Sequence, residues 1–214
     1  MASTTPDIID LLVGVAPGSP IDLIRAERPE TKLNAQKSYL ALFEPAHIGD
    51  IDLQERHAIA AFVTLLHACE RAADFYRERL SSNGASPSFL AAIRAESERG
   101  LTRGPYGKFP PGPLSVENTE GPIFETSAFS SSVLGPKLAA ALNHTHLLVF
   151  RPRDASAAAL QKLLDAGWSN GAIVTLSQIV AFLSFQIRVV IGLTALAQSA
   201  GLEKGVTAQK EIVA

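Results

Sequence analysis

The 214-residue chain is rather apolar and carries almost no net charge, and these totals exclude several classes of protein. Hydrophobic residues make up 47% of it, charged residues make up 19%, and the formal net charge is -2. A mean hydropathy of +0.17 on a nearly neutral chain favours apolar subunit contacts, so we expect a homo-oligomer. Because phosphate binding needs a basic face, nucleic acid is not expected as a partner.

The single cysteine, Cys69, excludes an intramolecular disulfide and a cysteine-rich zinc site. The first ten residues contain Asp7 and Asp10 and no basic region, so they do not resemble a secretory signal. We therefore expect a cytoplasmic protein.

Capping residues followed by proline predict the starts of three short helices. Thr5, Ser19 and Ser86 each precede a proline that would take the first helical position. A further helix is predicted over residues 32–43, ended by Pro45. We interpret residues 1–50 as a helical extension packed on the main domain.

A capping box at Asp52 and Glu55 predicts the start of a long helix, because no breaker follows it before Asn83. We predict one continuous helix over residues 53–80. Its apolar residues recur every three or four positions and form one stripe. Cys69 belongs to this stripe and should point inward, whereas Arg56 lies off it.

Residues 103–122 are rich in proline and glycine and predict a long irregular loop. Such a segment is a packed surface loop, a lid, or an arm that reaches a neighbouring subunit. Helices are predicted again over residues 136–150, 155–166 and 169–199, with almost no strand signal. The fold class is therefore all-α, with a single main domain over residues 51–200 and a tail over residues 201–214.

The last predicted helix is apolar enough to be weighed as a membrane span. It contains Gln178, Gln186 and Arg188, and an arginine near the middle of a span is costly. A buried helix of a bundle is therefore favoured, and no membrane is expected.

Neither a metal nor a cofactor is indicated. His144 and His146 lie two apart on a predicted helix and point in different directions, so they cannot bind one metal together. His67, Glu70 and Asp74 share a polar face, for which solvation is the favoured interpretation. The sequence also lacks a glycine-rich phosphate loop and a nucleophile elbow.

The segment LQERHAIAAFVTLLHACERAADFY, residues 53–76, resembles the AhpD-like, or carboxymuconolactone decarboxylase, superfamily. In that superfamily a helix carries a glutamate, a cysteine twelve residues on, a second cysteine three further and a histidine four further. The segment GWSNGAIVTLSQIVAFLSFQIRVVIGL, residues 167–193, is similar to the second helical segment of its peroxidase-related branch, whose arginine falls on Arg188. The resemblance covers about residues 51–196 and implies an AhpD-like helical bundle that forms oligomers.

Carried over position by position, the resemblance gives an incomplete motif. Cys69 takes the place of the first cysteine and Ala72 that of the second, while Tyr76 replaces the histidine and His57 the glutamate. In the superfamily the second cysteine attacks the peroxide and the first then forms a disulfide with it. Because Ala72 has no thiol, that cycle is not possible within this chain. Placing Glu55 on the glutamate position would move Cys69 out of register.

The candidate catalytic residues are therefore Cys69, Tyr76 and His57, and three functions are open. The first is a residual peroxidase-related oxidoreductase in which Cys69 works with an external thiol. The second is a non-catalytic subunit that assembles with an intact two-cysteine relative. The third is a thiol-free enzyme of the lactone decarboxylase type, in which His57 or Tyr76 is the acid or base for a small organic acid. Against all three, a lone cysteine on an apolar stripe is usually a small core residue.

Overall fold

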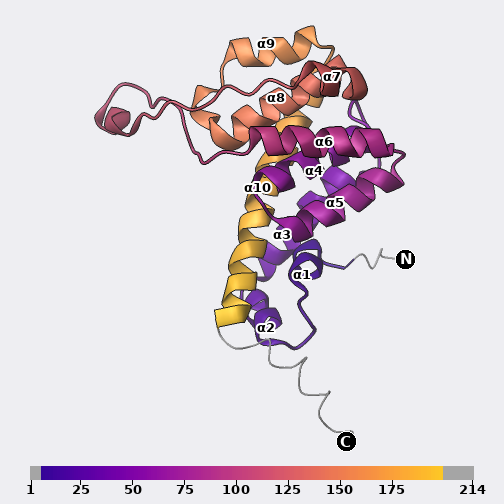
Figure 1. The fold of residues 1–214 in the computed structure, drawn as a ribbon. Helices are drawn as coiled ribbons and strands as arrows, with labels where there is room; N and C mark the ends of the chain where they lie inside the picture. The colour runs from indigo at the N-terminus through magenta and orange to yellow at the C-terminus, as the bar shows by residue number, and fades with distance from the viewer. Residues whose placement is uncertain (1–5, 200–214) are drawn as a thin grey trace, which may run out of the picture.

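The computed structural model describes residues 6–199, which form ten α-helices and two short 3-10 helices (Figure 1). In chain order the elements are α1 (Ile8–Val13), α2 (Pro20–Ala26), α3 (Pro29–Phe43), α4 (Leu53–Leu66), α5 (Glu70–Ser82), α6 (Pro87–Gly100), η1 (Pro113–Glu117), α7 (Ala128–Leu134), α8 (Pro136–Phe150), η2 (Pro152–Asp154), α9 (Ala157–Asp165) and α10 (Asn170–Ser199). Within residues 6–199, the only β pairing is an isolated bridge between Gly107 and Thr119. The all-α prediction is confirmed. The predicted tail, residues 201–214, lies outside the described residues.

Helix α4 lies at the centre of the core and contacts α5, α6, α8 and α10. Its buried residues lie on all sides of the helix, and small ones such as Ala58 and Ala61 let the neighbouring helices approach closely. Arg56, which was expected to lie off the apolar stripe, is also buried. Its guanidinium donates to the carbonyl oxygens of Leu42, Ile48 and Ile51 at 2.6, 2.7 and 3.0 Å, so main-chain dipoles compensate its burial.

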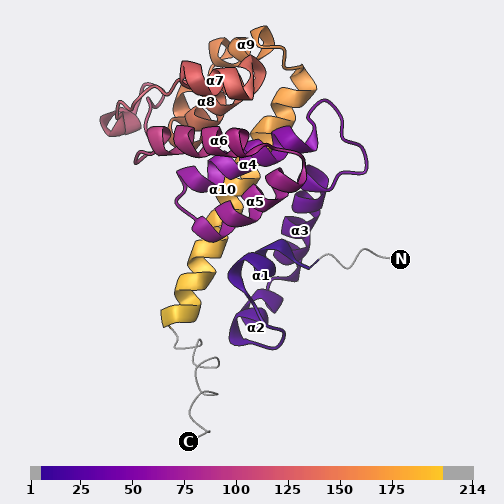
Figure 2. The same cartoon turned by 45° about the vertical axis from the view of Figure 1, so that its right-hand side comes forward.

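Helix α10 runs along most of the molecule, with α8 and α9 near its first half and α1 and α3 contacting it further along (Figure 2). The helix predicted over residues 169–199 is thus confirmed. By length and composition it is the one described helix that could cross a membrane, and 39% of its apolar window is buried. Because the core helix of a bundle passes the same test, this finding is weak evidence for a membrane span.

Several predicted helix starts agree with the structure and others differ. Helices α2 and α6 begin at the prolines that follow Ser19 and Ser86, and both serine side chains accept a backbone hydrogen bond. Helix α1 begins at Ile8 rather than at Pro6, because the Asp7 side chain caps it. Helix α3 begins three residues earlier than predicted, and α7 was not predicted at all.

The prediction of one continuous helix over residues 53–80 is wrong, because the chain turns back between α4 and α5. Ala68 has a φ of 51°, the only positive value at a described residue other than glycine. Its N–H donates to the Leu65 carbonyl at 2.9 Å, and that of Cys69 donates to the Thr64 carbonyl at 3.1 Å. This pattern is a Schellman motif, which ends helices at a left-handed residue.

Helices α4 and α5 therefore form an antiparallel hairpin. Gln54, at the start of α4, donates to the carbonyl oxygen of Asn83, just after the end of α5, at 3.4 Å. A left-handed conformation costs alanine about 1 kcal/mol or more, so the packing of the two helices against each other must offset the cost at Ala68.

The proline- and glycine-rich segment projects from the helical body as an arm rather than packing along it (Figure 1). Its base is fixed by a hydrogen bond from the Tyr106 N–H to the Phe150 carbonyl at 2.6 Å and by Arg153, whose guanidinium stacks 3.8 Å from the Phe109 ring. Near its far end, Val116 is 90% exposed. The arm therefore presents an apolar side chain to solvent.

Candidate functional site

The hairpin of α4 and α5 brings two of the three candidate residues together. The rings of His57, on α4, and Tyr76, on α5, have centroids 6.4 Å apart. Phe43, from the end of α3, packs against both, with centroids 5.4 Å from His57 and 5.0 Å from Tyr76. The result is a buried aromatic cluster at the open end of the hairpin.

His57 is held in a defined tautomer by its own helix. Its Nδ1 lies 2.6 Å from the carbonyl oxygen of Leu53, one turn earlier. Because a carbonyl can only accept, Nδ1 carries the proton and Nε2 keeps a lone pair. Burial lowers the pKa of His57, so the imidazole is neutral near neutral pH. His57 thus offers a base at Nε2.

Tyr76 is fully buried and hydrogen-bonded to a residue of α10. Its hydroxyl donates to Oε1 of Gln186 at 2.8 Å. Burial raises the pKa of Tyr76 well above its ordinary value, so the phenol stays protonated. The Nε2 of Gln186 has no hydrogen-bond partner among the described residues. The cluster therefore keeps one buried donor without a partner.

Cys69 lies apart from this pair, at the turn of the hairpin. It is the N-cap residue of α5, its side chain makes no capping hydrogen bond, and it is 8% exposed. The inward orientation predicted for it is confirmed. Cys69 lies seven positions before Tyr76, which is about 10 Å along the axis at about 1.5 Å per residue. Ala72, fully buried, lies between them, one turn from each.

Sequence reasoning missed two members of the cluster. The sequence marks Phe43 only as the end of a helix before Pro45. It marks Gln186 only as a polar residue that disfavours a membrane span. A glutamine inside a 30-residue apolar helix is a signal for a buried partner, and here that partner is the Tyr76 hydroxyl.

A second candidate site lies on the other side of the core, between α8, α9 and the segment that precedes α7. It contains a cavity of about 290 Å³ lined by both apolar and polar side chains. None of the candidate catalytic residues lines it. His144 does, and it is 5% exposed. An adjoining hollow at the base of the arm shares Arg151 and Asp154 with it.

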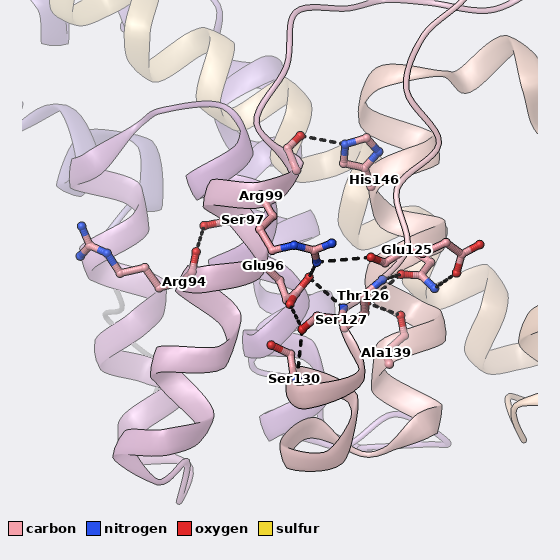
Figure 3. Close-up of polar contacts among 12 residues, drawn as sticks. Arg94, Glu96, Ser97, Arg99, Glu125, Thr126, Ser127, Ser130, Ala139 and His146 are labelled. Carbon is pink, nitrogen blue, oxygen red and sulfur yellow. Dashed lines mark hydrogen bonds and ion pairs between the residues drawn. The ribbon is translucent and has the colours of Figure 1, made fainter.

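One wall of this cavity is fixed by hydrogen bonds between α8 and the segment before α7 (Figure 3). Oδ1 of Asn143 accepts from the N–H and the hydroxyl of Thr126 at 2.8 and 2.7 Å. Its Nδ2 donates to the Glu125 carboxylate at 2.9 Å. The His146 ring stacks on Phe124 at 4.7 Å and its Nε2 donates to the Gly100 carbonyl at 2.8 Å. The wall is therefore preformed.

A buried carboxylate ties the same wall to α6 (Figure 3). Glu96 accepts hydrogen bonds from the Ser127 hydroxyl at 2.5 Å and the Ser127 N–H at 3.3 Å, and it pairs with Arg99. Burial raises the pKa of Glu96, but the hydrogen bonds from Ser127 and Ser130 and the charge of Arg99 lower it overall. Glu96 is thus charged at neutral pH and stabilises the contact between α6 and the segment before α7.

Residues 6–199 contain no group of three histidine, cysteine or acidic side chains that could hold a metal ion. No protein-family model matches the sequence, and no curated protein matches it either. What the two regions can do must therefore be argued from their own residues.

Proposed function

We propose that this chain is an AhpD-like, peroxidase-related protein with an incomplete thiol pair. The observation that supports it most strongly is the helix break, which leaves Cys69 as the N-cap of α5 and Ala72 in the first turn. Reactive cysteine pairs favour the first turn of a helix, because the helix dipole stabilises a thiolate there. The turn between α4 and α5 thus has the geometry that a two-cysteine centre needs and lacks one sulfur.

The pairing of His57 with Tyr76 supports the same proposal. The resemblance assigns these positions to a glutamate and a histidine, which would have to meet across the hairpin to activate a thiol at position 72. Tyr76 is four residues after Ala72 and shares its face of α5. The 6.4 Å between the two rings is compatible with that arrangement.

The chemistry left to this chain is narrow. A hydroperoxide can oxidise the Cys69 thiol to a sulfenic acid and leave as an alcohol, but no second thiol of the chain can resolve it. An external thiol would have to reduce the sulfenic acid. Because Cys69 is buried and two turns from Tyr76, the geometry favours a protein that has kept the fold and lost most turnover, as a non-catalytic partner of an intact relative would.

The proposal includes a homo-oligomer in which two copies of the chain contact each other through α10. Val174, Phe185 and Leu196 lie on one side of this helix and expose between 40% and 58% of their surface. An apolar face of this kind on a chain with a net charge of -2 is expected to be covered by another protein surface, most simply a second copy.

The decisive experiment restores the missing sulfur with Ala72→Cys. Side chains three apart on a helix lie within reach of each other, so Cys69 and the new thiol should form a disulfide. After treatment with cumene hydroperoxide, the mass should fall by two hydrogen atoms, and hydroperoxide consumption with dithiothreitol should exceed that of the unmodified chain roughly tenfold.

Ala72→Ser is the matched control, because it changes the same position without adding a thiol. It should give neither the mass loss nor the gain in turnover, and Cys69→Ser combined with Ala72→Cys should abolish the mass loss, because its single thiol has no partner for a disulfide. A folded Ala72→Cys protein, checked by circular dichroism, that keeps two free thiols after oxidation would refute the proposal.

A further inference from the structure

The cavity between α8 and α9 is large enough for a small organic molecule and is apolar over most of its wall. A cavity of about 150 Å³ holds benzene, so its volume of about 290 Å³ accommodates a ring with a short side chain. Phe124, Ala140, Leu147, Ala158 and Ala159 supply the apolar lining. Such a wall favours the hydrocarbon part of a ligand.

A buried imidazole without a partner lines the same cavity. The side chain of His144 is 5% exposed and makes no hydrogen bond to any of residues 6–199. Burial lowers its pKa, so it is neutral and carries one N–H donor. Its ring nitrogens are not among the fully buried side-chain atoms that lack a partner, so they stay open to the cavity, where a ligand acceptor can take the N–H hydrogen bond.

The cavity also receives the N-terminus of α9, a helix of nine residues. Ser156, Ala158 and Ala159 line it. The Ser156 hydroxyl accepts from the Ala159 N–H at 3.3 Å, which leaves the N–H groups of Ala157 and Ala158 without an intrahelical acceptor. Lys162, on the same helix, adds an ammonium to the rim. Backbone donors, the helix dipole and a cation thus favour an anionic group at this end.

Two acidic side chains line the cavity as well, and neither cancels this preference. Asp154 is neutralised by Arg151, whose guanidinium contacts it at 2.7 and 2.8 Å. Glu125 is 63% exposed and lies 3.7 Å from the ammonium of Lys162, a distance at which an exposed pair contributes little. Lys162 can therefore turn to a ligand carboxylate.

We propose that this cavity binds a small, mainly apolar carboxylic acid, with its carboxylate between His144, Lys162 and the N-terminus of α9 and its hydrocarbon part against Phe124 and Leu147. This site is additional to the hairpin of α4 and α5, with which it shares no lining residue. The binding test below does not depend on thiol chemistry, so its failure would leave the Ala72→Cys test intact.

The test compares three probes of one shape on the full chain by isothermal titration calorimetry. Cinnamate carries the carboxylate, cinnamamide replaces it with a neutral amide, and cinnamylamine reverses the charge. Because a hydrogen bond to a charged group is stronger than one to a neutral group, cinnamate should bind about tenfold or more tightly than cinnamamide, and cinnamylamine should bind weakest. Equal affinities for the three probes, or no binding of cinnamate, would overturn the proposal.

Two substitutions locate the site. His144→Leu removes the imidazole donor and should weaken cinnamate binding about tenfold. Ala140→Phe fills the cavity and should abolish it. His67→Leu is the matched control, because His67 is also partly buried but contacts Ser184 and lies outside the cavity. Cinnamate binding that survives Ala140→Phe, or that His67→Leu weakens as much as His144→Leu does, would place the site elsewhere. The comparison of the three probes needs no substitution and decides the proposal if a variant does not fold.

Discussion

The hairpin of α4 and α5 and the cavity between α8 and α9 use buried histidines in opposite ways. In the hairpin, the Nδ1–H of His57 donates a hydrogen bond to the Leu53 carbonyl, and the ring packs against Phe43 and Tyr76. At the cavity, His144 has no described partner and borders empty volume. In the first region the side chains pack against one another, whereas the second region contains a preformed cavity.

This difference shows that the residues that carry the family resemblance and the residues that a ligand could reach lie in different parts of the molecule. The residues that carry the family resemblance converge on one another and exclude solvent, as a structural core does. At the cavity, the unpartnered side chain of His144 borders open volume, whereas in the hairpin cluster the unpartnered Nε2 of Gln186 is fully buried.

The largest expected effect separates the two regions by stability. Tyr76→Ala should lower the free energy of unfolding by about 4 kcal/mol, because the fully buried ring would leave a void beside Phe43 and Phe75. Leu147→Ala should cost less, about 1 to 2 kcal/mol, because Leu147 is only partly buried and already borders a cavity. Urea unfolding measures both, and equal losses would break the distinction between a closed and an open region.

An intermediate loss of unfolding free energy tests whether the Glu96 carboxylate stabilises the cavity wall. Glu96→Gln should cost about 2 kcal/mol, since the hydrogen bonds of a buried charge to Ser127 and Arg99 are lost or weakened. Glu98→Gln, on the same helix, is the control. Glu98 is 66% exposed, and its pair with Arg94 should contribute less than about 1 kcal/mol. Similar losses in urea unfolding would show that Glu96 does not hold the wall.

The smallest effect for a single residue is the pH dependence that each buried histidine contributes, and it is expected in both regions. Burial lowers the pKa of His57, His144 and His146 in the folded chain below the value of about 6.5 in the unfolded chain. The unfolded state therefore binds more protons below that value. Stability should be greatest above about pH 6.5 and fall as the pH decreases toward the folded pKa values, by up to about 1 kcal/mol per histidine and pH unit.

Urea unfolding at about pH 7.5 and about pH 5.5 measures this dependence. Replacing His57 or His144 with glutamine should reduce it, and replacing the exposed His47 should leave it unchanged. Carboxylates such as Glu96 and Asp154, whose pKa is lowered, act only at more acidic pH. A stability that rises on acidification through this window would contradict the burial of neutral histidines.

Local signals were sufficient for much of the helical framework. Ser19 and Ser86 ahead of prolines predicted α2 and α6, and the capping box of Asp52 and Glu55 predicted the start of α4. These signals work because each acts within one helical turn. The candidate site was predicted only in part: His57 and Tyr76 meet, whereas Cys69 lies at the other end of the hairpin.

The sequence by itself determined the all-α class, the residue range of α10 and the absence of a second thiol. Only the tertiary structure decided that the chain turns at Ala68, because no glycine or proline marks that turn and the packing of α4 on α5 must offset its conformational cost. The same holds for the cavity, whose wall joins the Thr126 segment to Asn143 and whose donors come from α8 and α9. Contacts between segments far apart in the chain leave no periodic pattern in the sequence.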